Sequence, residues 1–190
     1  MKRRVSVLPL IAVIVFAAVS CDKVRDKEVI TVKLGAQENN VTDGFYAVEE
    51  NATYTMAESS VLPEKIDIFC FYESETGNNI ALASPGTGIT GIFTGDNAPD
   101  TWATKNTTSF IVTALTAEQF EAVQEGDALI VSSFDAANAR RKAKDLQEGQ
   151  VWSFMTSDGI YGLLLVTEVK QGADGEVAFI LKTRKIIDGR

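Results

Sequence analysis

The sequence contains no histidine and only two cysteines among its 190 residues. Without histidine, neither the Ser-His-Asp nor the Cys-His catalytic arrangement can form, and histidine-based zinc sites are excluded. Two cysteines are also too few for a four-cysteine zinc site. Carboxylate chemistry and an oxygen-ligand calcium site are the alternatives left, and no Asp-x-Asp-x-Asp-Gly calcium loop is present. We therefore expect no cofactor, no metal and no catalytic residues.

Positive charge is scarce relative to negative charge. The chain has 18 lysines and arginines against 26 aspartates and glutamates, a formal net charge of −8. Three of the basic residues, Lys2, Arg3 and Arg4, lie in the first few positions. An acidic surface repels nucleic acid phosphates and anionic lipid head groups, so we expect no nucleic acid partner.

The first 20 residues have the organisation of a cleaved signal peptide. Lys2-Arg3-Arg4 precede an apolar run over residues 5–19, and Ala18-Val19-Ser20 place small side chains immediately before Cys21. The apolar run has about 15 residues, whereas a membrane-spanning helix needs roughly 20. The pattern therefore predicts a secretory signal over residues 1–20 and not a transmembrane anchor.

The position of Cys21 resembles that of the cysteine in a bacterial lipoprotein signal. In that class of protein the cysteine after the cleavage site becomes the lipid-bearing N-terminus, which implies lipidation of Cys21 and a membrane partner bound through the lipid. The charged run that follows suits a flexible tether over residues 21–28. Cleavage without lipidation is the alternative, because Ala18 and Ser20 also satisfy the ordinary cleavage rule. In that case the protein would be secreted or periplasmic.

The second cysteine, Cys70, lies in an apolar stretch over residues 66–72. If Cys21 carries lipid, Cys70 has no partner for a disulfide within the chain. Nucleophilic cysteines require a positive or basic neighbour, and none is close to Cys70 in the sequence. We expect Cys70 to be a small buried hydrophobic residue.

Residues 29–190 are expected to form a single, mostly β domain. In the first half, alternating and β-branched patterns predict a strand over 28–34, a strand pair over 45–48 and 52–55, and a central strand over 66–72 that pairs with 80–83. Residues 59–63 are expected to form a loop. From 84 to 108, repeated glycines and prolines predict a long irregular segment, which is the first place to look for a binding surface.

The second half begins with a predicted strand over 109–113. A capping box at Thr116 and Gln119 predicts a helix that ends at Gly126. A strand is expected over 128–132, and a second helix over 135–146 with the basic run 140–144 on its solvated face. A soft domain boundary is possible near residues 108–114.

The chain ends in a predicted meander of three strands over residues 151–156, 161–169 and 176–184. Ser157-Asp158-Gly159 is a hairpin turn signal, and the apolar run 163–166 predicts a buried central strand. The fold class we predict is mainly β or α+β. It consists of an antiparallel sheet, sandwich-like or meandering, with two short helices, after a cleaved signal peptide.

Several parts of the chain resemble the small cell-envelope lipoproteins of Bacteroidales, a group of uncharacterised function. The resemblance is carried by Ala18 to Asp22, by Ile66-Asp67-Ile68 leading to Ala83-Ser84-Pro85, and by the closing hairpin with Asp158-Gly159, Tyr161-Gly162-Leu163 and Val166. It implies that the protein is located at the outer membrane or the cell surface. It supplies no catalytic residues.

The function expected from these observations is a lipid-anchored, non-enzymatic binding or assembly module for a glycan or an envelope protein. Glycan binding uses exposed aromatic rings beside amides and carboxylates, and the best such group in the sequence comprises Trp102, Asp96, Asn97, Asp100 and Asn106. The alternative for Trp102 is that it fills the end of the core. The alternative function is a carboxylate-dependent glycoside hydrolase, which needs two acids some 5–10 Å apart. No pair of acids in the sequence has a distinguishing context.

Overall fold

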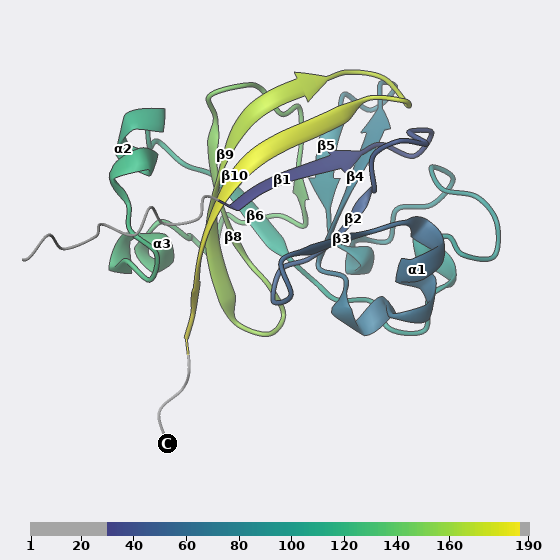
Figure 1. Cartoon of the computed structure of the whole chain (residues 1–190), viewed down its shortest axis with the longest axis horizontal. Coiled ribbons are helices and arrows are strands. Elements are labelled where there is room, and N and C mark those ends of the chain that lie inside the picture. Colours follow the sequence, from purple (N-terminus) through teal and green to yellow (C-terminus); the bar gives the residue numbers. More distant parts are fainter. Residues whose placement is uncertain (1–29, 187–190) are drawn as a thin grey trace, which may run out of the picture.

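The computed structural model describes residues 30–186. Cys21, the predicted signal peptide (1–20), the tether (21–28) and the beginning of the predicted strand at 28–34 lie outside these residues. Within them, the strands form two five-stranded sheets (Figure 1). The first sheet has the order β1 (Ile30–Gly35), β10 (Glu176–Lys185), β9 (Ile160–Lys170), β8 (Val151–Met155) and β6 (Ser109–Val112).

The second sheet has the order β3 (Ala52–Tyr54), β2 (Phe45–Ala47), β4 (Ile68–Glu73), β5 (Asn79–Ala83) and β7 (Lys142–Ala143). Each sheet contains a strand from the other half of the chain: β1 pairs with β10 in the first sheet, and β7 pairs with β5 in the second. All of these pairings are antiparallel. The mainly β, sandwich-like fold class is confirmed, and the segment 108–114 contains β6 at one edge of the first sheet.

Alternation along the central strands divides the core into layers. On β9, Leu164 and Val166 pack between the two sheets, whereas Leu163 and Leu165 face the opposite side. Successive side chains of a strand point to opposite faces, so an apolar run can be buried on both. β9 lies in the middle of its sheet, as the run 163–166 predicted.

The second sheet is also covered on both faces. On β4, Cys70 packs between the sheets, while Phe69 and Phe71 belong to a second apolar cluster on the outer face. Cys70 is fully buried, as predicted, and burial raises the pKa of its thiol. A thiol held in this neutral, inaccessible form is a packing residue and not a nucleophile.

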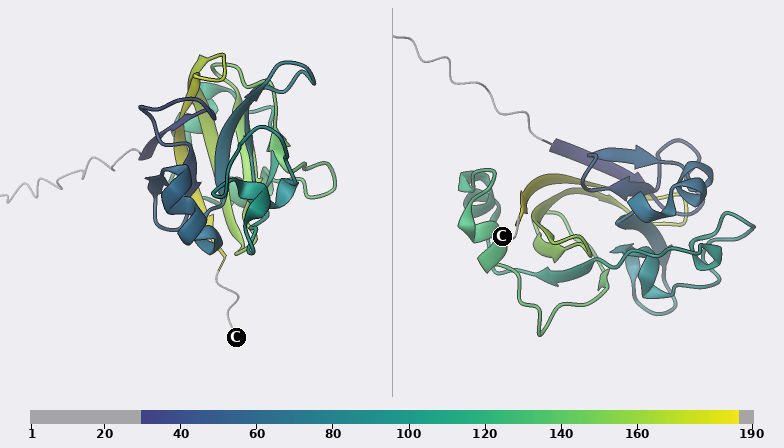
Figure 2. Two further views of the ribbon diagram at one scale, coloured as in Figure 1. Left: turned by 90° about the vertical axis from the view of Figure 1, so that its right-hand side faces the viewer. Right: turned by 90° about the horizontal axis from the view of Figure 1, so that it is seen from below.

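Helices and loops cover the two outer faces at opposite ends of the molecule (Figures 1 and 2). α2 (Ala117–Ala122) and α3 (Ala128–Ser132) pack with the outer residues of β8 and β9. α1 (Met56–Val61) and the segment 84–108 pack with those of β4 and β5. Short 3-10 helices are η1 (Pro63–Lys65), η2 (Pro85–Thr87) and η3 (Pro99–Thr101). None of the helices within residues 30–186 has the length and hydrophobicity needed to cross a lipid bilayer.

The predicted capping box at the start of α2 is present. The Thr116 hydroxyl accepts a hydrogen bond from the backbone N–H of Gln119, and the Gln119 side chain accepts one from the backbone N–H of Thr116. The helix ends at Ala122, earlier than the predicted end at Gly126. Val123 follows in extended conformation and remains buried.

The helix α1 was not predicted, since residues 59–63 were expected to form a loop. A second capping box begins it: the Glu58 N–H donates to the Thr55 hydroxyl at 3.2 Å, and the Glu58 carboxylate accepts from the Thr55 N–H at 2.9 Å. The spacing Thr55-x-x-Glu58 is readable in the sequence. The six-residue helix is too short for a periodic apolar face to reveal it.

The strand predicted over residues 128–132 is wrong, because these residues form α3. The Asp127 carboxylate accepts a hydrogen bond from the Leu129 N–H at 2.9 Å and so caps the helix. Ile130 is buried, whereas Leu129 is 36% exposed. A five-residue apolar run fits a strand and a helix equally well, so capping and packing decided between them.

The helix predicted over residues 135–146 is also wrong. Asp135 instead forms a turn in which its carboxylate accepts from the Ala137 N–H at 3.0 Å. Such side-chain bonds to nearby backbone compete with helix formation. Arg140 then bridges to Phe110 of β6, and the chain continues into β7.

The residues that suggested this helix are nevertheless buried. Ala143 and Leu146 both lie in the core between the sheets. The Leu146 N–H donates to the Ile80 carbonyl at 3.1 Å, so the segment extends the edge of the second sheet. The basic run 140–144 therefore lies along an extended edge segment and not on a helix face.

Candidate functional site

Trp102, the aromatic residue of the predicted binding group, lies in the apolar cluster on the outer face of the second sheet. Its side chain is 6% exposed, and its ring centroid is 5.6 Å from that of Phe45. The indole N–H donates to the Asn97 carbonyl at 2.9 Å. A stacking platform requires an exposed ring face, so this burial favours the alternative in which Trp102 fills the end of the core.

The polar members of the predicted group lie around this ring. Asp96, Asn97 and Asp100 are exposed and precede Trp102 on the same loop. Asn106 is directed elsewhere, because its amide donates to the Glu64 carbonyl at 2.6 Å. Two further bonds lie within the same loop, from Thr101 Oγ1 to the Asp96 carbonyl and from Lys105 Nζ to the Asp100 carbonyl, and Ser60 Oγ of α1 donates to Asn97 Oδ1.

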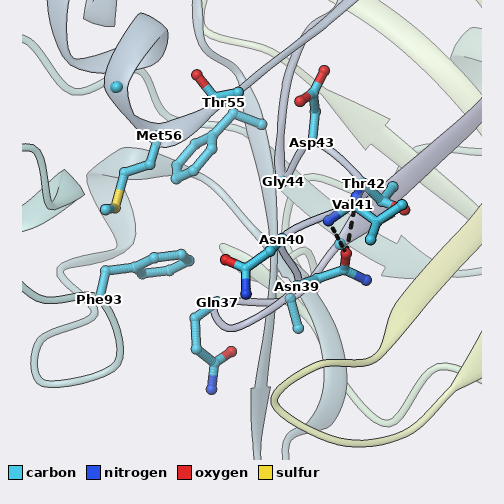
Figure 3. A pocket seen from close by; sticks show the side chains of 14 residues that line it. Gln37, Asn39, Asn40, Val41, Thr42, Asp43, Gly44, Thr55, Met56 and Phe93 are labelled. Atoms are coloured by element: carbon cyan, nitrogen blue, oxygen red, sulfur yellow. Dashed lines mark hydrogen bonds between the residues drawn. The ribbon is translucent and has the colours of Figure 1, made fainter.

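A hollow that sequence reasoning missed lies on the neighbouring surface (Figure 3). Its volume is about 340 Å³, and it is enclosed by the β1–β2 loop (residues 36–44), by the start of α1 and by Phe93. A second hollow of about 310 Å³ adjoins it and shares Gln37, Met56 and Phe93 as lining residues. We refer to the two together as the β1–β2 groove.

One wall of the groove is apolar. The half-buried Phe93 ring has its centroid 5.5 Å from that of Phe45 and 5.3 Å from that of Phe69, with an edge-to-face orientation to the latter. These two buried rings fix the position of Phe93. Phe93 and Met56 lie side by side and face Asn40 across the open space (Figure 3).

The opposite wall is the β1–β2 loop, and the side chain of Asn39 organises it. Asn39 Oδ1 accepts hydrogen bonds from the N–H groups of Val41 at 3.0 Å and Thr42 at 2.9 Å. Its Nδ2 donates at 3.1 Å to the carbonyls of Asp174 and Gly175 in the β9–β10 turn. One side chain therefore shapes the loop and ties it to another turn.

Gln37 attaches the same loop to the second sheet. Its amide Nε2 donates to the Tyr72 carbonyl at 2.9 Å, and its Oε1 accepts from the Tyr72 N–H at 2.9 Å. The side chain thus pairs with β4 much as a neighbouring strand would. The loop is held in place from both sheets, so its conformation does not depend on a ligand.

Two glycines at the base of the loop allow its ends to meet. The Gly35 N–H donates to the Asp43 carbonyl at 2.9 Å. A Cβ atom on Gly35 would lie 2.5 Å from the Thr42 carbonyl oxygen, and one on Gly44 would lie 2.8 Å from the Gly35 carbonyl oxygen. The close approach of the two chain segments therefore requires glycine at both positions.

The charge of the groove is negative. Asp43 lines the first hollow and Glu38 the second, and neither hollow has a lysine or arginine among its lining residues from the described part of the chain. Asp43 Oδ2 accepts from the Thr53 hydroxyl at 3.0 Å. No cluster of three or more metal-ligating side chains occurs within residues 30–186.

Among residues 30–186, Asp67 is the one buried carboxylate, and it lies outside the groove. Desolvation raises its pKa to about 6, although the hydrogen bond that it accepts from the Val48 N–H at 2.9 Å opposes that rise. Asp158 also raises the pKa of Asp67 through its charge. Asp67 therefore accepts a hydrogen bond from Val48, the residue that follows β2.

Comparison with models of known protein families found no match, and comparison with curated proteins found none. Among solved structures, the chain is similar to the crystal structure of a DUF4466 family protein from Parabacteroides merdae, a member of the Bacteroidales. The two are 18% identical with a TM-score of 0.55, and the match covers 82% of this chain. It covers 54% of the other protein, so the chain spans about half of that protein's length. At this identity the likeness is one of fold.

Proposed function

We propose that this protein is a non-enzymatic binding module, held at the cell envelope by a lipid on Cys21, and that its ligand site is the β1–β2 groove. The ligand is a glycan or a partner protein. The observation that carries the proposal is the combination of a hollow with an accessible Phe93 and a loop that Asn39 and Gln37 hold rigid. Rigid sites bind with less loss of conformational entropy than flexible ones.

The location of the groove supports its use as a contact surface. Val41, at the tip of the β1–β2 loop, is 95% exposed, and Val41 also lines the first hollow. An exposed valine on one wall of a hollow, with a partly exposed aromatic ring and a methionine on the other, is typical of binding surfaces. The predicted tether and lipid at Cys21 would hold this surface at the outer membrane or the cell surface.

The positions of the carboxylates favour a binding role over glycoside hydrolysis. Hydrolases of that kind use two acids across a cleft, one of them with a raised pKa. Asp67 has the raised pKa but lies outside the groove, whereas Asp43 and Glu38 line separate hollows with no buried acid beside them. The groove supplies contacts for a ligand without an evident pair of acids to cleave it.

The proposal is tested by incubating the mature protein with envelope polysaccharides and envelope proteins and measuring what it retains. The wild type is compared with Phe93→Ala and with Val112→Ala, which truncates a half-exposed apolar residue on β6 outside the groove. We expect the wild type to retain ligand. Phe93→Ala should lower the affinity at least about tenfold, or 1.4 kcal/mol, whereas Val112→Ala should leave it unchanged. Equal retention by the wild type and both variants would show that the groove is not the ligand site.

A further inference from the structure

We infer that the ligand of the β1–β2 groove is an uncharged polysaccharide, bound with one sugar on each side of the ridge that Phe93 and Met56 form. This inference rests on the proposed function, because it names the ligand class of the same site. Three features of the groove carry it: its charge, the state of its backbone hydrogen-bonding groups, and its division into two adjoining hollows.

Charge excludes acidic ligands. Among the residues described by the structure, no cationic side chain lies beside the lining carboxylates Asp43 and Glu38 in either hollow, so a uronate, sulfate or phosphate group would meet repulsion there. The net charge of −8 for the whole chain adds to that repulsion at longer range. Sugar hydroxyls, by contrast, can donate hydrogen bonds to carboxylates without carrying charge.

The backbone of the groove argues against a peptide. Extended peptides bind by adding a strand, which requires free N–H and C=O groups on the receptor. In the β1–β2 loop five of the N–H groups already donate within the protein, so no continuous row of free donors is left for an added strand: Ala36 to Gly175, Glu38 to Ala173, Asn39 to Ala36, and Val41 and Thr42 to the Asn39 side chain. Recognition therefore falls to side chains.

The side chains that remain available suit a sugar. Asn40 is exposed, and its amide has no hydrogen-bond partner among the described residues. An amide both donates and accepts, as the paired hydroxyls of a sugar ring require. Phe93 and Met56 face Asn40 across the hollow (Figure 3), so the apolar C–H face of a ring could lie against them while its hydroxyls reach Asn40.

The two hollows point to a polymer. Each is near the lower end of the usual range for ligand pockets, about 300–1,000 Å³, with volumes of about 340 and 310 Å³. They share Gln37, Met56 and Phe93, so a chain crossing this ridge would place consecutive units in both.

The inference is tested by calorimetric titration with neutral hexasaccharides of glucose, mannose, xylose and N-acetylglucosamine. Hexagalacturonate serves as the acidic glycan and a mixed decapeptide pool as the peptide. We expect a neutral hexasaccharide to bind, with an affinity that changes little as the salt concentration rises. Asn40→Ala and Phe93→Ala should each lower that affinity at least about tenfold.

Asn40→Ala keeps the test decisive if Phe93→Ala disturbs folding, because Asn40 contacts solvent. Groove-dependent binding of hexagalacturonate or the peptide pool, without a neutral sugar, would overturn the inference and leave the proposed binding role standing. Sugar binding that neither variant weakens would overturn the site. Binding of none of these probes would also overturn the inference, and retention of envelope material would then decide the proposed function separately.

Discussion

Lys182 of β10 holds the C-terminal end of α2 through Phe120. Its Nζ donates to the Phe120 carbonyl at 2.6 Å and lies 4.6 Å from the centroid of the Phe120 ring. The same ammonium group donates to the carbonyls of Glu121 at 3.0 Å and Val123 at 2.6 Å. The last carbonyls of a helix lack hydrogen-bond donors within it and carry partial negative charge. An ammonium group at this end supplies donors and also interacts favourably with that charge.

Replacing this ammonium group should loosen α2. We expect Lys182→Met, which keeps the apolar stem, to lower the free energy of unfolding by about 1–3 kcal/mol because three carbonyls lose a charged donor. Urea denaturation measures the change. Lys144→Met, at an exposed lysine, is the matched control, and a similar small effect in both variants would contradict the role assigned to Lys182.

The buried carboxylate of Asp67 should make stability depend on pH. Its pKa is raised from 3.8 to about 6 in the folded protein. Its contribution to stability is therefore fully present below pH 4 and is lost as the pH rises through 6, because the folded state binds the proton more tightly. The difference amounts to about 3 kcal/mol at neutral pH.

Asp67→Asn isolates this contribution, since all other titrating groups are shared. The free energy of unfolding of the variant, minus that of the wild type, should increase between pH 4 and pH 7 by up to about 3 kcal/mol. Urea titrations at a series of pH values measure the difference. A difference that stays constant across that range would show that Asp67 ionises normally.

Truncation of the central strand should be costly. Leu164 is fully buried between the two sheets, so Leu164→Ala is expected to lower the free energy of unfolding by about 2–5 kcal/mol through lost burial and a residual cavity. Val61→Ala, at a residue that is 74% exposed, should change it by less than about 0.5 kcal/mol. Comparable losses in the two variants would place Leu164 outside the core.

The base of the β1–β2 loop should not tolerate a side chain. In Gly35→Ala the new Cβ would lie 2.5 Å from the Thr42 carbonyl oxygen, so the loop must move. We expect a loss of about 1–3 kcal/mol in stability and amide chemical-shift changes centred on residues 36–44. Gly77→Ala, where a Cβ would meet nothing within 4 Å although φ is +69°, should cost stability through backbone strain alone and leave the shifts of residues 36–44 unchanged. Unchanged loop shifts in Gly35→Ala would contradict the close approach.

Anchoring through Cys21 is tested directly by mass spectrometry of the mature N-terminus. We expect cleavage before Cys21 and a mass increase corresponding to several acyl chains, since one chain binds a membrane only marginally. Cys21→Ser should abolish the added mass and release the protein from the membrane fraction. An unmodified N-terminal cysteine in the wild type would favour the secreted or periplasmic alternative.

Most strands could be predicted because their apolar patterns are strong. The meander of β8, β9 and β10 and the pairing of β4 with β5 follow from alternation and turn residues such as Asp158-Gly159. The capping box of α2 likewise joins two residues that are close in the sequence, Thr116 and Gln119. These features depend on residues close together in the chain, so the sequence specifies them directly.

The errors occur where distant contacts decide. Residues 128–132 form a helix because Ile130 packs against the first sheet, and Ala143 lies in a strand because the edge of β5 is available to it. Within the candidate site, Asn39-Asn40 and Asp43-Gly44 are turn signals that can be read from the sequence. Their association with Met56 and Phe93 was not predictable, because it depends on how α1 and the segment 84–108 cover the second sheet.

The sequence by itself determined the strand-rich fold class and the absence of histidine chemistry, since composition and local pattern are enough for these, whereas attachment at Cys21 stays a prediction. Tertiary structure alone decided that Trp102 is buried while Phe93 is accessible. Both rings lie in one irregular segment with no periodicity and both pack against Phe45, so the difference arises only from how the surrounding loops cover them.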